Sequence, residues 1–230
     1  MKVPFNVEEF LNVFAAYNQA IWPAQIVAYG LGLLALVLIA RGHRHAGRVT
    51  AAILAALWVW NGAAYHIAFF SPINPAAFGF GALFVVQGLL FLYFGVVQAR
   101  LSFQVSRSAA SIAGVLTLAY AAVVYPLIGH FAGHNYPFAP MFGVAPCPTT
   151  IFTFGLLALA DRKVPKLLLV APLLWTLIAT NAALSFGIYE DYGLLPAAVV
   201  GTWGALMAGR NKNATRSEGR VSDPAARSEA

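Results

Sequence analysis

Apolar residues in this chain occur in long blocks, which are separated by short polar segments or by runs rich in glycine and proline. Most blocks approach the roughly 20 residues that a helix needs to cross a membrane. We expect about seven transmembrane helices, over residues 22–40, 49–70, 76–98, 108–129, 147–160, 164–186 and 192–208. The sequence therefore predicts an all-α fold, a polytopic membrane helix bundle in which residues 1–208 form one transmembrane domain.

A shorter amphipathic segment at residues 7–21 precedes these blocks. Phe10 and Phe14 fall on one face of the helix that it would form, and polar residues fall on the other. Asn6 and Glu9 have the spacing of a capping box, with Asn in place of Ser or Thr. We interpret the segment as an interfacial helix that lies flat on the membrane. The alternative is a soluble helix that packs on a neighbouring loop.

Composition and charge agree with a membrane protein. The chain of 230 residues is 60% hydrophobic and 10% charged, whereas a soluble domain carries about 25% charged residues. Of its 14 Lys and Arg residues, 13 follow the first, third, fifth and seventh blocks, and Lys2 is the exception. This asymmetry predicts a cytoplasmic C-terminus, an external N-terminus and no role in binding nucleic acid. Residues 209–230 are small, polar and charged, which predicts a disordered cytoplasmic tail.

The stretch before the fifth block is unusual, because it is free of charge and repeatedly broken by glycine and proline. The apolar run 149–160 that follows would rise only about 18 Å as a helix, against a bilayer core of about 30 Å. We therefore predict that residues 131–146 form a partly re-entrant outer loop. Irregular backbone at membrane depth needs surrounding protein or a water-filled cavity. We expect a recessed cavity with the start of the fifth helix as its floor and residues 130–136 as its roof.

Polar groups near the predicted outer ends of the helices form a candidate substrate site. Its residues are His66, Tyr136, Cys147, Thr149, Thr150 and Asn181. Pro148 fits the first turn of a helix, so Cys147 is predicted to be the N-cap. The positive end of the helix dipole would there stabilise a thiolate or a bound anion. The alternative is that the cysteine is inert packing.

A metal site is a second interpretation of the same region. His66, His130, His134 and Cys147 together would supply nitrogen and sulfur ligands for a transition-metal ion. His130 and His134 would share a helical face only if their helix continued past two nearby glycines. Haem would need two histidines on facing helices, and only His66 and His130 qualify. The third interpretation is that the histidines form ordinary hydrogen bonds. No buried lysine or pair of buried aspartates is expected, so neither a retinal site nor a proton relay is indicated.

Four motifs carry a resemblance to a known family: YNQAIWPAQ at 17–25, FFSPINPAA at 69–77, GHNYPFAP at 133–140 and FGVAPCPTTIFTFG at 142–155. Over residues 3–208 the chain resembles a family of small bacterial integral membrane proteins that carry a domain of unknown function and are sometimes labelled permease-like. The resemblance implies a multi-pass protein of the bacterial cytoplasmic (inner) membrane. It implies no catalytic residues.

The leading functional hypothesis is a transporter or permease-like protein with an outer-facing site for a small solute or ion. The alternatives are a membrane-embedded redox or thiol enzyme that uses Cys147 or a haem-binding subunit, and a non-transporting membrane subunit or sensor. The sequence contains no P-loop, no dinucleotide-binding fingerprint and no zinc-protease motif. A single cysteine excludes an internal disulfide. The sequence does not specify an oligomeric state.

Overall fold

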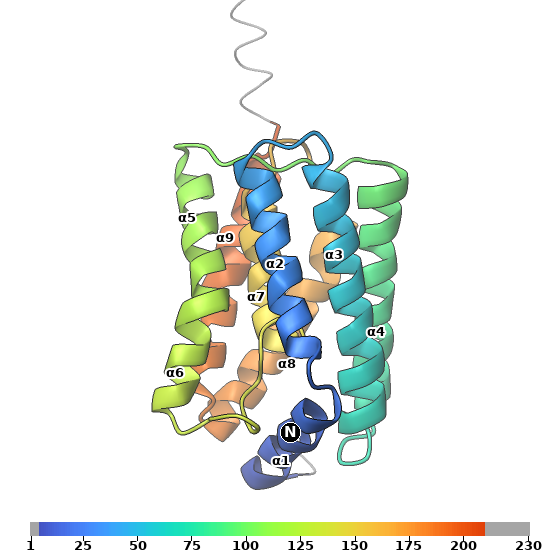
Figure 1. Ribbon diagram of the computed structural model, residues 1–230, viewed down its shortest axis with the longest axis vertical. Helices are drawn as coiled ribbons and strands as arrows, with labels where there is room; N and C mark the ends of the chain where they lie inside the picture. Colours follow the sequence, from blue (N-terminus) through green and yellow to red (C-terminus); the bar gives the residue numbers. More distant parts are fainter. Residues whose placement is uncertain (1–4, 210–230) are drawn as a thin grey trace, which may run out of the picture.

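The computed structural model describes residues 5–209 and shows a bundle of helices that run between two ends of the molecule (Figure 1). Within this range there is no β-strand, and Phe103 and Ala160 form an isolated β-bridge. The all-helical fold is therefore confirmed. The elements of the bundle are α2 (Ala24–Ala40), α3 (Ala46–Trp60) with η1 (Asn61–Phe70), α4 (Ala77–Phe91) with η2 (Leu92–Val97), α5 (Ala109–Ala119) with η3 (Tyr120–Val124) and α6 (Tyr125–Phe131), α7 (Pro146–Ala158), α8 (Leu167–Phe186) and α9 (Leu194–Met207).

Four of these helices are long and apolar enough to cross a membrane: Ala46–Phe70, Ala77–Val97, Ala109–Phe131 and Leu167–Phe186. A fifth is added if α1 (Val7–Ala20) and α2, which meet at 85°, are counted as one broken span. α7 is a shorter apolar helix of 13 residues. The lengths are those of a membrane protein, and the count of seven crossings stays a prediction.

α1 lies across the end of the bundle (Figure 1). Its N-terminus is the capping box that the sequence predicts. The Asn6 side chain accepts a hydrogen bond from the Glu9 backbone N–H at 2.9 Å, and the Glu9 carboxylate accepts one from the Asn6 N–H at 2.8 Å. The helix buries Phe14 and Tyr17 against the bundle. One face of α1 is thus held by protein, because aromatic side chains anchor it to η1.

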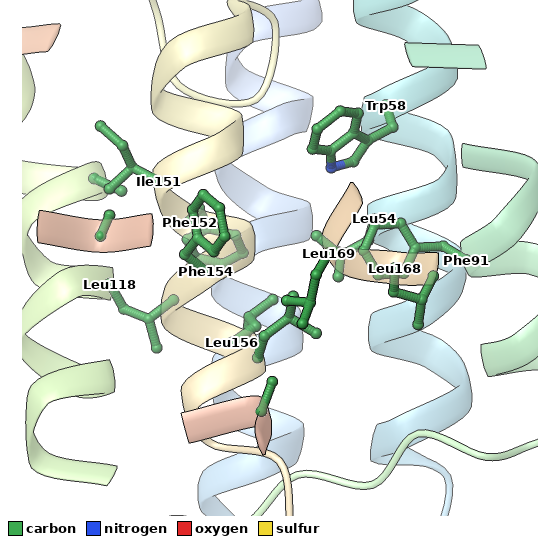
Figure 2. Packing of buried hydrophobic residues seen from close by; sticks show 14 of the residues in the cluster. Leu54, Trp58, Phe91, Leu118, Ile151, Phe152, Phe154, Leu156, Leu168 and Leu169 are labelled. Atoms are coloured by element: carbon green, nitrogen blue, oxygen red, sulfur yellow. The ribbon is translucent and has the colours of Figure 1, made fainter. Parts of the chain in front are cut away.

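α7 is the centre of the core: each of its residues except Cys147 is buried (Figure 2). α9 approaches it closely because glycines face it. A methyl group added at Gly201 would lie 2.7 Å from the Phe154 Cα, and one added at Gly204 would lie 2.6 Å from the Ala158 Cα. Small residues that allow backbones to approach in this way are typical of helix packing in membranes.

The irregular segment 132–145 packs against the end of the bundle, and side chains from other elements satisfy its carbonyl groups. The Asn18 amide donates to the carbonyls of Pro137 and Ala139, at 2.6 and 2.8 Å. The Tyr17 hydroxyl donates to the Val144 carbonyl at 2.8 Å. Asn61 in η1 donates to the Gly143 carbonyl at 3.0 Å. These bonds supply partners for backbone that no helix could satisfy.

The opposite end of the bundle gathers the basic residues of the described chain. The segments 98–108 and 159–166 meet there, since the Gln104 N–H donates to the Leu159 carbonyl and the Asp161 N–H to the Ser102 carbonyl. The eight described basic residues all lie at this end, in or beside its loops: Arg41, Arg44, Arg48, Arg100, Arg107, Arg162, Lys163 and Lys166. Lys2 and the predicted tail from residue 210 lie outside the described residues.

The close contact of α9 with α7 gives a stability prediction. Gly201→Ala places a methyl group against the Phe154 backbone, so it should destabilise the protein by about 1–3 kcal/mol. Gly30→Ala is the matched control, because its added methyl group meets nothing within 4 Å. The control should leave stability unchanged or raise it slightly. Thermal unfolding in detergent measures both, and equal melting temperatures for the two variants would contradict the packing argument.

Candidate functional site

A cavity of about 640 Å³ lies at the end opposite the basic residues, beneath α1. Its volume falls in the range of about 300–1,000 Å³ that is typical of ligand sites. Apolar and aromatic side chains make up most of the lining. The lining residues are Phe5, Phe10, Leu11, Phe14, Tyr65, Phe70, Asn74, Ala76, Phe80, Pro140, Ala145, Pro146, Cys147, Trp175, Leu177, Ile178, Ala179, Asn181, Ala182, Phe186, Ile188 and Asp191.

The start of α7 borders this cavity through Ala145, Pro146 and Cys147. Residues 130–136 do not line it, so the predicted roof is wrong. The aromatic face of α1 lies in that place instead. α1 can cover the cavity because the sharp bend before α2 returns it across the end of the bundle.

Cys147 is the second residue of α7 and not its N-cap. The N-cap is Ala145, with extended backbone (φ −107°, ψ 144°), and Pro146 takes the first helical position. The prediction chose Pro148 for that position, although both prolines fit the first turn, where a missing N–H removes no helical hydrogen bond. The Cys147 side chain is partly buried and lines the cavity.

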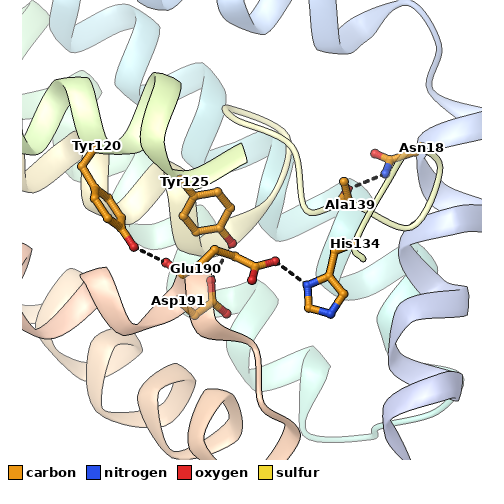
Figure 3. Close-up of polar contacts among 7 residues, drawn as sticks. All are labelled: Asn18, Tyr120, Tyr125, His134, Ala139, Glu190 and Asp191. Atoms are coloured by element: carbon orange, nitrogen blue, oxygen red, sulfur yellow. Dashed lines mark hydrogen bonds and ion pairs between the residues drawn. The ribbon is translucent and has the colours of Figure 1, made fainter. Parts of the chain in front are cut away.

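Two carboxyl groups that the sequence analysis did not assign to the site are buried beside the cavity. Glu190 and Asp191 belong to η4 (Tyr189–Gly193), which follows α8, and they are 0% and 6% exposed. The Tyr125 hydroxyl donates to the Asp191 carboxyl at 2.5 Å (Figure 3). The sequence places both acids in a short loop between apolar blocks, where solvation is the usual expectation. The neighbouring tyrosines were the one available signal of burial.

Glu190 has its own partners. Its carboxylate lies 2.8 Å from the His134 Nδ1, and the Tyr120 hydroxyl donates to its backbone carbonyl at 2.7 Å (Figure 3). The second oxygen of the carboxylate, Oε2, is buried without a hydrogen-bond partner. Glu190 therefore ties the segment after α6 to η4.

Asp191 faces the cavity and is the acidic residue available to a ligand there. Burial raises the pKa of this carboxyl to about 7, and hydrogen bonding from Tyr125 acts in the opposite direction. The Cys147 thiol lies within interaction range of the same carboxyl. Asp191 consequently changes charge near neutral pH.

Of the predicted substrate-site residues, Cys147 and Asn181 line the cavity. Thr149 and Thr150 are fully buried, and their hydroxyls donate to carbonyls one turn earlier in α7, at 2.7 and 2.8 Å. Tyr136 is 52% exposed and packs against the Trp22 ring. The sixth predicted residue, His66, does not line the cavity either. The structure thus brings two of the six predicted substrate-site residues to the cavity.

His66 is fully buried in an aromatic environment, with its ring 4.9 Å from the Trp175 ring and 4.7 Å from the Phe84 ring, measured between centroids. Neither ring nitrogen has a hydrogen-bond partner. Unsatisfied buried polar groups are costly and uncommon in proteins. The Trp175 indole, whose ring contacts His66, interacts with the Cys147 thiol, and both Trp175 and Cys147 line the cavity.

The residues predicted to hold a metal do not converge. Among residues 5–209 no group of three or more His, Cys, Asp or Glu side chains is arranged to hold a metal ion. His130 contacts Asn135 at the exposed end of α6, and His134 contacts Glu190 beyond Gly133, whose φ of +92° follows the end of that helix. The haem interpretation required His66 and His130 on facing helices. His66 is enclosed by aromatic rings, whereas His130 is exposed.

Comparison with known proteins identifies a family. Residues 7–216 match the family of unknown function DUF6064, and the chain belongs to this family. The expected membership of a family with a domain of unknown function is confirmed. No curated protein and no solved structure matches the chain.

Asp191 gives a prediction for the dependence of stability on pH. A carboxyl whose pKa is raised on folding stabilises the protein fully below its unfolded value, near 3.8, and loses that contribution as pH rises to about 7. Asp191→Asn should remove this loss, which is on the order of a few kcal/mol. Thermal unfolding in detergent between pH 4 and 7.5 measures it. Glu8→Gln, on the exposed side of α1, should retain the wild-type slope; equal slopes for all three proteins would contradict the prediction.

Proposed function

We propose that this member of the DUF6064 family is a permease-like membrane protein that binds a small solute in the cavity beneath α1. The cavity that ends at the first turn of α7 is the observation that carries the proposal. The chain enters that turn from an irregular segment. Helices interrupted in this way are where membrane transporters place substrate sites.

The cavity provides both apolar surface and polar groups for a solute. Aromatic rings form its walls, and polar groups of Cys147, Asn181 and Asp191 lie on its lining. A few polar groups in an apolar pocket orient a ligand, because unpaired polar contacts are costly there. The Glu190 carboxylate oxygen Oε2, which is buried without a hydrogen-bond partner, adds hydrogen-bonding capacity beside Asp191.

The proposed topology has seven crossings of the bacterial cytoplasmic membrane, an external N-terminus and a cytoplasmic C-terminus. Its support is the concentration of the described basic residues at one end of the bundle. The cavity would then open toward the outside. α7 would cross as a short helix extended by segment 132–145, whose carbonyls are satisfied by protein donors.

A second candidate function is thiol chemistry at Cys147. The thiol is partly buried on the cavity lining, within range of the Asp191 carboxyl. A neighbouring acid–base group is one requirement of an activated nucleophile. A carboxyl partner does not favour a thiolate as a cation would, so the solute site remains the preferred function.

Labelling of single cysteines tests the topology. In a Cys147→Ala background, Tyr136→Cys and Arg44→Cys introduce exposed thiols at opposite ends of the bundle. A membrane-impermeant maleimide should label Tyr136→Cys in intact cells and Arg44→Cys only after lysis. The reverse pattern would place the cavity on the cytoplasmic side.

The native cysteine tests solute binding. Cys147 is partly buried, so small maleimides should modify it more slowly than the exposed Tyr136→Cys. Solutes that raise the melting temperature should slow the modification of Cys147 and leave that of Tyr136→Cys, in the Cys147→Ala background, unchanged. The same solutes should enter proteoliposomes that contain the protein. Stabilisation without protection would move the site away from this cavity, and protection without uptake would indicate a sensor or subunit.

A further inference from the structure

The rim of the cavity reaches the apolar outer surface of the bundle. Leu177 and Ile178 of α8 line the cavity and are also 66% and 38% exposed on the outside. Phe10 and Phe14 of α1 also line the cavity, where Phe14 stacks on Tyr65 of η1 and Phe10 meets Phe70 of η1 edge-on. If the bundle crosses a membrane, a ligand can enter this cavity from the apolar layer as well as from water.

The charge of the lining is one-sided. Asp191 is an ionisable acid, and among residues 5–209 no Lys, Arg or His lines the cavity. The described Lys and Arg residues are all at the other end of the bundle. Glu190 also lies beside Asp191, with His134 as its partner. An anionic ligand would therefore meet repulsion and no compensating cation.

No Lys or Arg is among the contacts that the structure gives Asp191, and His134, whose charge favours the ionised carboxyl, is paired with Glu190. It accepts a hydrogen bond from Tyr125 and lies near the Cys147 thiol, and both of these groups are neutral in their ordinary state. A buried carboxylate without a cation is unfavourable, and a proton or a bound cation removes the cost. The cavity thus offers a carboxyl group without a Lys or Arg partner at the polar end of an apolar space.

The walls are suited to the same kind of ligand. Eight aromatic residues line the cavity: Phe5, Phe10, Phe14, Tyr65, Phe70, Phe80, Trp175 and Phe186. The faces of aromatic rings attract cations, and this attraction strengthens when water is excluded. Aromatic walls also favour the apolar groups that surround the charge in a lipophilic cation.

We propose that the cavity beneath α1 binds lipophilic organic cations, with the Asp191 carboxylate as the counter-charge and the aromatic walls as the surface for their apolar groups. This inference rests on the proposed function, because it names the solute class of the same site. Binding exchanges one positive charge for another: the carboxyl group releases its proton to solution when the cation enters. A proton and the ligand therefore compete for Asp191.

Other ionisable groups face Asp191 and share its environment. They are Tyr65 of η1, Tyr120 of η3, Tyr125 of α6, His134 of the following segment, Cys147 of α7 and Glu190 of η4. His134 pairs with Glu190 and does not line the cavity. Substitution of Asp191 is accordingly the change that isolates the competing group.

The test uses the full chain in lipid nanodiscs and three probes of similar bulk: tetraphenylphosphonium, tetraphenylborate and neutral triphenylphosphine oxide. Empty nanodiscs correct for partition into lipid. Tetraphenylphosphonium should bind with about tenfold higher affinity at pH 8 than at pH 6, because a proton competes at a group of pKa about 7. Tetraphenylborate should not bind in the cavity, and the neutral probe should bind weakly with no dependence on pH.

Two variants and a control complete the experiment. Asp191→Asn should weaken tetraphenylphosphonium binding at pH 8 at least tenfold and abolish its pH dependence. Phe80→Leu should weaken binding severalfold and keep the ratio between the two pH values, so it still tests the inference if Asp191→Asn misfolds. Glu8→Gln, an exposed residue outside the lining, should behave as wild type.

The outcomes separate this inference from the function on which it rests. Equal affinity for the cation and the borate, or cation binding that is insensitive to pH in the wild type, would overturn the assignment of ligand class. If those probes fail while other solutes protect Cys147, the solute site stands and the cation class is rejected. If no solute protects Cys147 and none of the probes binds, both proposals are rejected.

Discussion

The burial of α7 is the constraint on which the rest of the structure depends. This helix has 13 residues and is surrounded by other helices, so it spans about 20 Å at 1.5 Å per residue. The chain enters this helix from the irregular segment 132–145. The carbonyl groups of this segment have no helical partners and need other donors. Side chains of other elements donate hydrogen bonds to these carbonyl groups, chiefly Asn18 of α1 and Asn61 of η1.

This solution explains why α1 is part of the bundle. Tyr17 and Asn18 on one face of α1 bond the carbonyls of segment 132–145, and Phe14 on the same side packs against Tyr65 of η1. The helix is thereby held across the end of the bundle. Because it is held there, it covers the space left in front of the short helix. The cavity is thus a consequence of the length of α7 and of the contacts that compensate for it.

Much of the fold could be predicted from the sequence, because long apolar blocks and their charged or proline-rich ends determine where membrane helices begin and end. The capping box of α1 could also be predicted, because it depends on Asn6 and Glu9, which are close together in the sequence. The site was harder to predict. Pro146 and Pro148 both fit the first turn of a helix, so the local sequence does not decide which of them is the first helical residue. The burial of Glu190 and Asp191 depends on Tyr120, Tyr125 and on the turn at Gly187, where φ is +69°.

The same separation of charge that predicts orientation also accounts for the character of the site. Within residues 5–209, the basic residues lie at one end and leave the other without the Lys or Arg side chains that usually compensate buried carboxylates. His134 supplies a partner for Glu190, and hydroxyl groups supply hydrogen bonds. Burial raises the pKa of Asp191 to about 7, so this carboxyl holds its proton up to about neutral pH. In the proposed site that proton would be exchanged for another cation without a net change in buried charge, and the aromatic walls would favour cations that carry apolar groups.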